Sequence, residues 1–371
     1  KFAVGLIVLT AVGGALGLIA MLNQGPLKSF FYKASVTYRG DYWRAGFRMF
    51  KNHPWFGVGL DRYGAYFRQY RSPQYPVNYG YDITSTAAHN VVIQIFATGG
   101  IFVGLAYLAI TGFVIYSAAQ GIRRNQGKAR LLVAGVFAAW IAYFAQSIVS
   151  IDNIGIAIWG WVLGGAVIGV SRVHDFEKIA DPANKGRIVA KPQSNMAIAQ
   201  PIISGVLVLS MLFLVVPMFK SETQSQSIGR YQIPADQTQR QSFHGLLKSA
   251  IDLPLLNPIY KAELAVKFAQ SGFVNESFDY LKKIQAEDPE SYTAPNIAAD
   301  FYEQLKQPQN AIAQRLQLEK LDPWGAANLL KLAKDYLAVG DKVKAKAVAQ
   351  KIIDMKARPE VVTEARAILA S

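Results

Sequence analysis

Long apolar runs alternate with polar segments along the first two-thirds of the chain. The runs cover residues 2–22, 91–119, 131–149, 154–170 and 196–218. A helix of about 20 apolar residues is long enough to cross the hydrocarbon core of a bilayer. We therefore expect an all-α, polytopic membrane domain over residues 1–218, with five transmembrane spans and one long polar loop, 23–90.

The pattern changes after the last run. Residues 219–252 read as a linker and a first helix, and residues 253–371 as amphipathic helices with an internal repeat. Asp288-Pro289 recurs 34 positions later as Asp322-Pro323. Other positions share this period: Ala265, Ala299 and Ala333; Phe268, Tyr302 and Tyr336; Ser277, Ala311 and Ala345; and Gly272, Lys306 and Gly340. Such a period resembles the tetratricopeptide repeat and predicts an α-solenoid with a surface for a protein partner.

Composition supports a membrane protein with a basic polar part. Charged residues make up only 17% of the chain, which is low for a soluble protein, yet the net charge is +14. Much of this charge lies beside apolar runs, which favours lipid or lipid-linked phosphates over nucleic acid as partners. The absence of cysteine excludes disulfides and thiolate sites. Because the apolar pattern starts at Lys1 without a methionine, we expect further spans upstream.

Basic residues predict the orientation of the spans. The short loop 121–130 contains Arg123, Arg124, Lys128 and Arg130. Positive loops of this kind face the cytoplasm, so alternation of the spans places loop 23–90 and residues 219–371 on the opposite side. Loop 23–90 is itself basic. Loops longer than about 60 residues follow the rule weakly, and an anionic substrate would account for the charge.

Within the long loop, residues 41–52 predict a helix that ends before Pro54. The helical spacing puts aromatic residues on one face and basic residues on a neighbouring face: Trp43, Phe47 and Phe50 on the first, Arg44, Arg48 and Lys51 on the second. One interpretation is a helix at the membrane surface whose cations bind phospholipid head groups. The other is a pyrophosphate site, because guanidinium groups bind phosphate oxygens in pairs.

An ordered set of motifs follows the same loop. They are Arg39-x-x-x-Trp43, His53-Pro54-Trp55-Phe56-Gly57-Val58-Gly59, and His89-Asn90 directly before an apolar run with Gly99-Gly100. Over about residues 1–170 this arrangement resembles the O-antigen ligase/polymerase superfamily, in which a tetratricopeptide tail is a frequent addition. The family often has Gly-x-x-Gly after His-Asn; here Gly100 fits and Val103 replaces the second glycine.

The resemblance implies an enzyme of the bacterial inner membrane that builds cell-surface polysaccharide such as lipopolysaccharide. It would pass a glycan from a polyprenyl pyrophosphate to a hydroxyl of a glycan, lipid or protein acceptor, without a metal or other cofactor. Arg39 falls on the family's pyrophosphate-binding arginine. His89 falls on the histidine that acts as general base or orients the acceptor. For the second pyrophosphate arginine we choose Arg68; the alternatives are Arg44, which we keep in the predicted site, Arg62 and Arg71.

The chemistry is consistent with these assignments. A leaving pyrophosphate needs fixed positive charge, which arginine supplies, and imidazole can take a proton from a hydroxyl near neutral pH. The other histidines have simpler interpretations: a helix end for His53, and surface positions for His174 and His244. No tight carboxylate spacing predicts a metal site. The acidic residues of the region, Asp41, Asp61, Asp82 and Asp152, are expected to pair with arginines, cap helices or form a turn, and Asp152 is near enough to reach the site.

Two further points stay open at this level. The loop's aromatic residues offer sugar-stacking surfaces or a membrane-interface belt: Tyr63, Tyr66, Phe67, Tyr70, Tyr75, Tyr79 and Tyr81. The alternative to an enzyme is a membrane anchor that presents the repeat domain, while a transporter is disfavoured because the spans contain few ionisable residues. Ligation and polymerisation are not distinguished.

Overall fold

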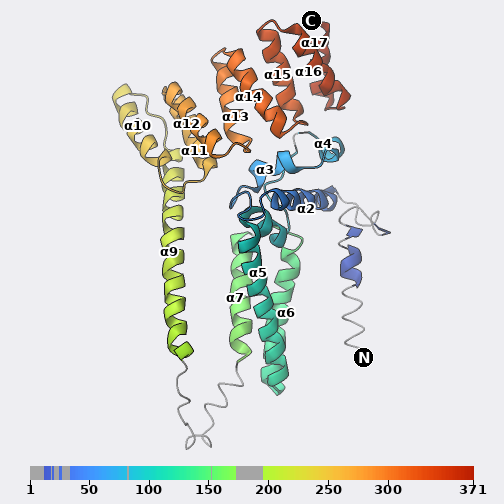
Figure 1. Ribbon diagram of the computed structural model, residues 1–371, viewed down its shortest axis with the longest axis vertical. Coiled ribbons are helices and arrows are strands. Elements are labelled where there is room, and N and C mark those ends of the chain that lie inside the picture. Colours follow the sequence, from blue (N-terminus) through green and yellow to red (C-terminus); the bar gives the residue numbers. More distant parts are fainter. Residues whose placement is uncertain are drawn as a thin grey trace, which may run out of the picture. The chain divides into compact units, whose positions relative to one another are not determined.

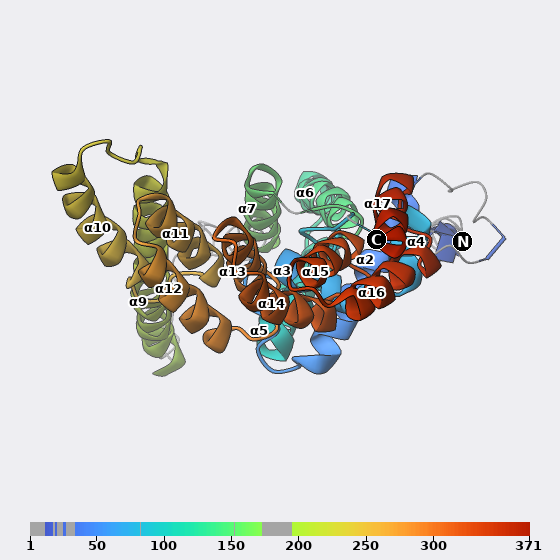
Figure 2. The ribbon, with the colours of Figure 1, turned by 90° about the horizontal axis from the view of Figure 1, so that it is seen from above.

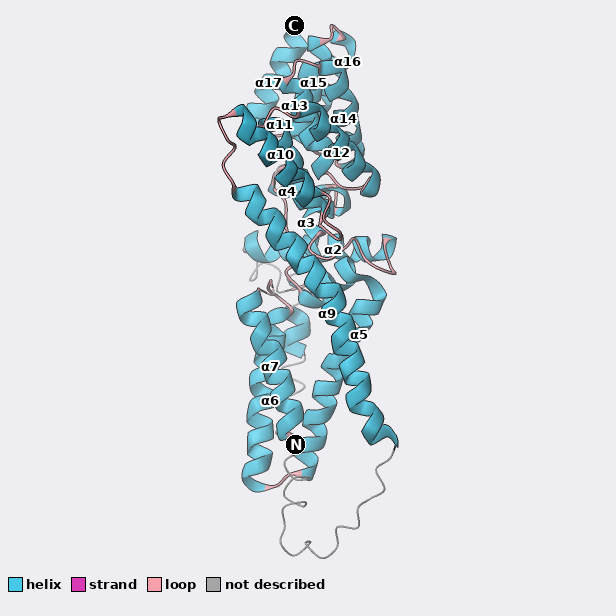
Figure 3. Ribbon diagram, turned by 90° about the vertical axis from the view of Figure 1, so that its left-hand side faces the viewer, coloured by secondary structure: helices cyan, strands magenta, loops and turns pink. Residues whose placement is uncertain are grey.

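The computed structural model describes residues 12–17, 19–20, 25–26, 34–81, 83–151, 153–172 and 195–371. Within these residues the secondary structure is helical, with connecting loops and no strand (Figures 1 and 3). The chain divides into two compact units, Lys1–Arg187 and Ile188–Ser371. The predicted domain boundaries at 218 and 252 stay predictions, and the two units are described separately below.

Three antiparallel helices form a bundle in the first unit: α5 (Val91–Arg124), α6 (Gly127–Ser147) and α7 (Ile154–Val170) (Figure 1). Small residues let α6 and α7 approach closely. A Cβ atom on Gly164 would lie 3.3 Å from the Trp140 indole nitrogen. The bundle core is small, and most apolar side chains on its outer surface are exposed. This distribution is expected for helices surrounded by lipid.

Most predicted spans correspond to helices. The spans 91–119 and 131–149 fall in α5 and α6, which are long and apolar enough to cross a membrane. Helix α7 is apolar but has only 17 residues. The span 196–218 falls in α9 (Asn195–Arg230) of the second unit, part of which also has the required length and hydropathy. The predicted span 2–22 lies largely outside the described residues, so the number of five spans stays a prediction.

The basic connection 121–130 is shorter than predicted. Helix α5 continues through Arg124, and only two residues separate it from α6. Arginines suit this last turn because their charge opposes the negative end of the helix dipole. The Asn125 amide then donates to the carbonyls of Gly121 (2.8 Å) and Ser171 (3.4 Å), which joins the end of α5 to the end of α7.

Helix α2 (Ala34–Asn52) lies across one end of the bundle, with α3 (Tyr63–Tyr70) and α4 (Gln74–Tyr79) on its other side (Figures 1 and 3). Aromatic side chains fill the core between them: Tyr42, Tyr63, Tyr66, Phe67, Tyr70 and Tyr75. These include most of the residues predicted to offer sugar-stacking surfaces. That prediction is wrong for them, because rings buried against one another are not accessible to a sugar.

The predicted aromatic face of α2 is not one surface. Trp43 is buried, and Phe50 packs edge-on against Phe96 of α5 at 5.2 Å between ring centroids. Phe47 is 64% exposed. The helix also begins at Ala34, before the predicted start at residue 41. Helical spacing alone placed the three rings together, but contacts with α5 cover only part of that face.

Helix α5 is interrupted at Gly100, whose φ is 70° and ψ −166°. The loop after α2 fits into this interruption. Three backbone hydrogen bonds join the segments: from Val58 to Ala97 (2.9 Å), from Gly59 to Thr98 (3.0 Å) and from Ile101 to Pro54 (2.8 Å). A Cβ on Gly57 would lie 2.4 Å from the Thr98 carbonyl carbon. The glycines of the His53–Gly59 motif therefore have a structural role.

The second unit contains α9, α10 (Gln237–Ile251) and a row of helix pairs (Figure 2). The pairs are α11–α12 (Pro258–Gln270, Val274–Glu287), α13–α14 (Thr293–Gln304, Pro308–Leu321) and α15–α16 (Ala326–Ala338, Lys342–Asp354), followed by α17 (Pro359–Ala370). The small residues predicted to share a period are fully buried. Gly272, Lys306 and Gly340 all have positive φ in the turn within each pair. The pairs follow the predicted period, and their tetratricopeptide type stays a prediction.

A buried arginine joins α13, α14 and α15. The Arg315 side chain is 1% exposed, and its guanidinium pairs with Asp300 (2.7 Å) and with Glu303 of α13. It also lies 3.6 Å from the Asp335 carboxylate of α15. Burial raises the pKa of Asp335 to about 6, and the nearby Glu303 carboxylate acts in the same direction.

Candidate functional site

A cleft of about 340 Å³ opens beside the start of α5. Three segments line it: the loops before α3 and α5, the first turns of α5, and the connection from α6 to α7. The polar side chains around it are Asp61, Thr86, His89, Asn90, Gln94 and Ser150. Of the predicted site residues, His89 is the one that lines this cleft.

Contacts on several sides hold His89 in place. Its φ is 54°, a left-handed conformation that costs energy for a residue other than glycine. The Trp43 indole N–H donates to the His89 carbonyl (3.4 Å), and the Tyr42 ring stacks on the imidazole at 5.2 Å between centroids. The preceding N–H, of Ala88, donates to the Gln94 side-chain oxygen (2.7 Å). Strain of this kind persists only where surrounding contacts impose it.

The residue after His89 explains the other half of the His-Asn motif. The Asn90 side chain accepts a hydrogen bond from the Ile93 N–H (3.0 Å) and so caps the N-terminus of α5. Its own backbone is extended, while that of His89 is left-handed. The motif therefore turns the chain into the helix and leaves the imidazole beside the cleft.

Electrostatics connect His89 with Arg39. Burial lowers the pKa of the half-buried His89 imidazole, and the positive charge of Arg39 lowers it further. Coulomb effects between side chains are screened beyond about 10 Å at physiological salt, so the guanidinium of α2 lies near the imidazole. A lowered pKa keeps His89 neutral near pH 7, the state in which it can accept a proton.

The two other predicted phosphate-binding arginines are placed differently. Arg44 forms an ion pair with Asp41 (3.2 Å), one turn earlier on α2. Arg68 is half-buried in the last turn of α3. Neither lines the cleft around His89. The structure thus brings Arg39 and His89 together and leaves Arg44 and Arg68 on neighbouring elements.

The alternative arginines have structural contacts. Arg62 lies over the Tyr66 ring at 5.2 Å and donates to its hydroxyl (3.1 Å). Arg71 is buried and donates to the carbonyls of Tyr81 (3.0 Å) and Ile83 (3.2 Å). These bonds connect α3 and the residues after it to the loop that leads to His89. Arg71 in particular stabilises that loop from inside.

The remaining histidines lie away from the cleft. The His53 ring nitrogen is 3.0 Å from the Tyr70 hydroxyl, and His244, in the second unit, pairs with Glu276 at 2.7 Å. His174, Asp82 and Asp152 lie outside the described residues. Among the residues that the structure does describe, no group of three histidine, aspartate or glutamate side chains could hold a metal ion.

Sequence reasoning missed two residues of the cleft. Asp61 lines it opposite the start of α5, with a φ of 56° that resembles the value for His89. The sequence signal was its position just after the Gly57–Gly59 turn. Gln94 both lines the cleft and holds the backbone before His89. Its signal was a polar side chain one turn inside an apolar run.

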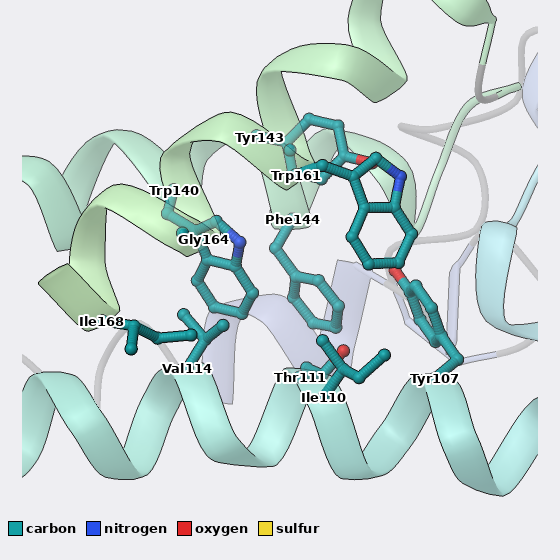
Figure 4. Close-up of a pocket in the computed structure, with 12 residues that line it drawn as sticks. Tyr107, Ile110, Thr111, Val114, Trp140, Tyr143, Phe144, Trp161, Gly164 and Ile168 are labelled. Atoms are coloured by element: carbon teal, nitrogen blue, oxygen red, sulfur yellow. The ribbon is translucent and has the colours of Figure 1, made fainter. Parts of the chain in front are cut away.

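A second cavity lies inside the helical bundle (Figure 4). It has a volume of about 230 Å³, and side chains of α5, α6 and α7 surround it, including Tyr107, Trp140, Phe144 and Trp161. None of its lining residues is charged. It therefore offers no acid or base, and the chemically equipped site of this unit is the cleft at His89.

Comparison with known proteins adds one finding. Residues 1–108 match the family model described as O-antigen ligase. The matched segment contains α2, α3, α4, the His89 loop and the first half of α5, and therefore Arg39 and His89. No curated protein and no solved structure matches the chain.

Proposed function

We propose that the protein is a glycosyltransferase of the O-antigen ligase kind in cell-surface polysaccharide biosynthesis. It moves a glycan from a polyprenyl pyrophosphate to an acceptor hydroxyl. The observation that carries this proposal is the proximity of the Arg39 guanidinium to the His89 imidazole, within the segment similar to that family. Two separate elements thus supply a fixed cation and a neutral base beside one cleft.

The proposed reaction uses both groups in one displacement. His89 accepts the proton of the acceptor hydroxyl while that oxygen attacks the anomeric carbon of the glycan. The bond from this carbon to the pyrophosphate oxygen breaks, and its electron pair leaves with the pyrophosphate. Arg39 stabilises the charge that develops on the leaving group. No step is assigned to a metal ion.

Donor binding would also prepare the base. In the empty site the charge of Arg39 disfavours a second positive charge on His89. A pyrophosphate on the guanidinium offsets that charge, so the imidazolium formed during transfer is better tolerated in the donor complex. Proton uptake by His89 is thereby favoured when a donor is present. Arg68 and Arg44, on helices packed beside Arg39, remain the further proposed pyrophosphate contacts.

The proposed site faces away from the cytoplasm. Four cations, Arg123, Arg124, Lys128 and Arg130, lie at the end of α5 and the start of α6. The positive-inside rule places this end in the cytoplasm, so the start of α5 with His89 lies at the outer face of the bacterial inner membrane. Lipid-linked glycans would be met there. The repeat unit is proposed on the same side, where it would bind a protein partner.

The test is a deletion strain complemented with wild-type protein, with His89→Ala or with His244→Ala as a control in the other unit. Lipid-linked and finished glycans are compared by mass spectrometry. We expect His89→Ala to lose at least about 100-fold in transfer while still inserting in the membrane, because the general base is missing. Loss of long chains would identify a polymerase, and stranded full-length chains a ligase.

Two outcomes contradict the proposal. Normal glycan transfer by His89→Ala would remove the histidine from the mechanism. Unchanged glycans in the deletion strain itself would reject the enzyme and favour the alternative, a membrane anchor that presents the helix pairs of the second unit to a partner.

A further inference from the structure

Helix α5 is longer than a membrane requires. Its 34 residues correspond to about 51 Å at 1.5 Å per residue, whereas the hydrocarbon core of a bilayer is about 30 Å thick. A part of the helix therefore lies outside the hydrocarbon. The interruption at Gly100 divides it into an upper segment, 91–99, and a lower segment, 101–124.

Exposure of α5 changes abruptly at this interruption. No residue from Val91 to Gly100 is exposed, because α2, α3 and the loop after α2 cover this segment. Large exposed apolar side chains begin at once below it: Phe102, Val103, Leu105 and Leu108. The lower segment thus has the surface of a helix in contact with lipid, and the upper segment has that of a helix in contact with protein.

The loop beside the interruption presents apolar side chains outward. Trp55 is 62%, Phe56 77% and Leu60 61% exposed. The loop does not move freely, because three backbone hydrogen bonds attach it to α5 on either side of Gly100. Trp55 and Phe56 also contact Phe102, with ring centroids 6.0 and 5.8 Å apart. Their exposed surface is therefore continuous with the lipid-facing surface of the lower segment.

Helix α2 adds charge next to this apolar surface. Phe47 is exposed on α2, and Arg44, Arg48 and Lys51 are exposed on the same helix, within one turn of it. A patch of large apolar side chains bordered by cations is unusual on a surface that faces only water. It is typical of a segment at a membrane interface, where aromatic side chains lie among head groups and cations contact phosphates.

We propose that the loop 54–60, together with Phe47, is embedded in the interface of the phospholipid bilayer and fixes the depth of the unit at Gly100. The phosphate groups of the lipids are the partners of the cations on α2. The segment 91–100, about 15 Å long at 1.5 Å per residue, then stands above the hydrocarbon. It holds the His89 cleft in the polar region. This inference is independent of the proposed function, because it rests only on exposure and attachment.

The absence of cysteine makes the test direct. Single cysteines are introduced as Phe56→Cys and Leu60→Cys, labelled with a nitroxide, and the full chain is placed in phosphatidylcholine–phosphatidylglycerol nanodiscs. Collision rates with dissolved oxygen, which concentrates in lipid, and with a water-soluble nickel chelate give the depth of each label. Asn78→Cys, exposed on α4, is the water control, and Phe113→Cys, exposed within the lower segment of α5, is the lipid control.

We expect labels at 56 and 60 to collide with oxygen several-fold more, relative to the nickel chelate, than the label at 78, and less so than the label at 113. Oxygen-to-nickel ratios equal to that at 78 would place the loop in water and overturn the proposal. Protection from both reagents would also overturn it, because a protein surface, and not lipid, would then cover the loop. Both labelled positions are exposed, so neither substitution removes a buried side chain.

Discussion

At the scale of single residues, Arg39 has two effects that substitution can separate. It lowers the pKa of His89 by its charge, and it is the proposed contact of the pyrophosphate. Lysine keeps the charge but offers a compact ammonium in place of the planar fork that binds two oxygens. Glutamine removes the charge altogether. The two variants therefore test the electrostatic and the geometric contributions independently.

We predict that Arg39→Lys lowers glycan transfer by about 10-fold or more, with the acid limb of the pH–rate profile in place, because the nearby charge is retained. Arg39→Gln should lower transfer further, by about 100-fold. Its residual activity should have an acid limb at higher pH, because without the guanidinium the pKa of His89 rises toward its ordinary value and the imidazole is protonated over a wider range. Transfer in isolated membranes measured from pH 5 to 8 checks both statements.

An Arg39→Lys variant with wild-type activity would contradict the paired phosphate contact. An acid limb that stays in place in Arg39→Gln would show that this limb does not report His89. Arg44→Lys is a suitable companion variant, because Arg44 has an ion pair with Asp41 and does not line the cleft. A loss in that variant equal to the loss in Arg39→Lys would indicate that both arginines contact the donor.

The identities of the two central site residues were predictable, and their geometry was not. Arg39 and His89 stand in short motifs that the eye can find in the sequence. The contacts that place the imidazole come from Trp43, Tyr42 and Gln94, and they depend on how α2 crosses α5. Asp61 was considered only as a partner of arginines, since nothing in the local sequence shows that the loop before α3 reaches the start of α5.

At the scale of elements, the connection between α5 and the loop after α2 depends on glycine. Gly57 has a φ of 67°, and a Cβ there would lie 2.4 Å from the Thr98 backbone. We predict that Gly57→Ala lowers the stability of the first unit by about 2 kcal/mol or more, because strain and a backbone clash act together. Thermal unfolding of the purified protein in detergent measures the change.

Gly112→Ala is the matched control for this prediction. It lies in the same helix, and a Cβ there meets no atom within 4 Å. Alanine in a regular helix is favoured over glycine by up to about 1 kcal/mol, so this variant should unfold at the same or a slightly higher temperature. Equal unfolding temperatures for Gly57→Ala and Gly112→Ala would show that the loop adapts without cost.

The elements themselves show where sequence patterns suffice. Apolar length alone located α5, α6 and α7, because a lipid-facing helix needs no partner to define its pattern. It did not reveal the break at Gly100, whose backbone partners lie about 40 residues earlier in the chain. The aromatic loop was misread for a related reason. Composition gives the residue types, but only the packing of α2 against α3 and α4 decides that Tyr63 or Tyr75 is buried.

At the scale of the whole molecule, the two units rely on different interactions. The bundle of the first unit has a small core and an apolar outer surface. The second unit is built from close helix contacts through alanine and serine, and it also encloses the Arg315 cluster. A buried charge cluster responds to pH in a way that apolar packing does not. The stability of the second unit should therefore depend on pH through a small number of identifiable groups.

Asp335 gives this dependence a definite sign. Its pKa in the folded protein is about 6, above the unfolded value near 4, so between these values the folded state binds more protons. Stability then falls as pH rises from about 4 to 6, and the ionised carboxylate at pH 7 is a net cost on the order of 2 kcal/mol. Asp300, whose pKa is lowered by Lys331 and Arg315, acts in the opposite direction, and its contribution is lost only at lower pH.

We predict that Asp335→Asn slows hydrogen exchange of α13, α14 and α15 at pH 7, because the amide keeps the shape of the side chain without its buried charge. Arg315 retains Asp300 and Glu303 as partners in this variant. At pH 5, where the wild-type carboxyl is largely protonated, the difference between the two proteins should shrink. Comparing variant and wild type at each pH by mass spectrometry cancels the intrinsic pH dependence of exchange. Faster exchange in Asp335→Asn at pH 7 would mean that the ionised carboxylate stabilises Arg315 by more than its own burial costs.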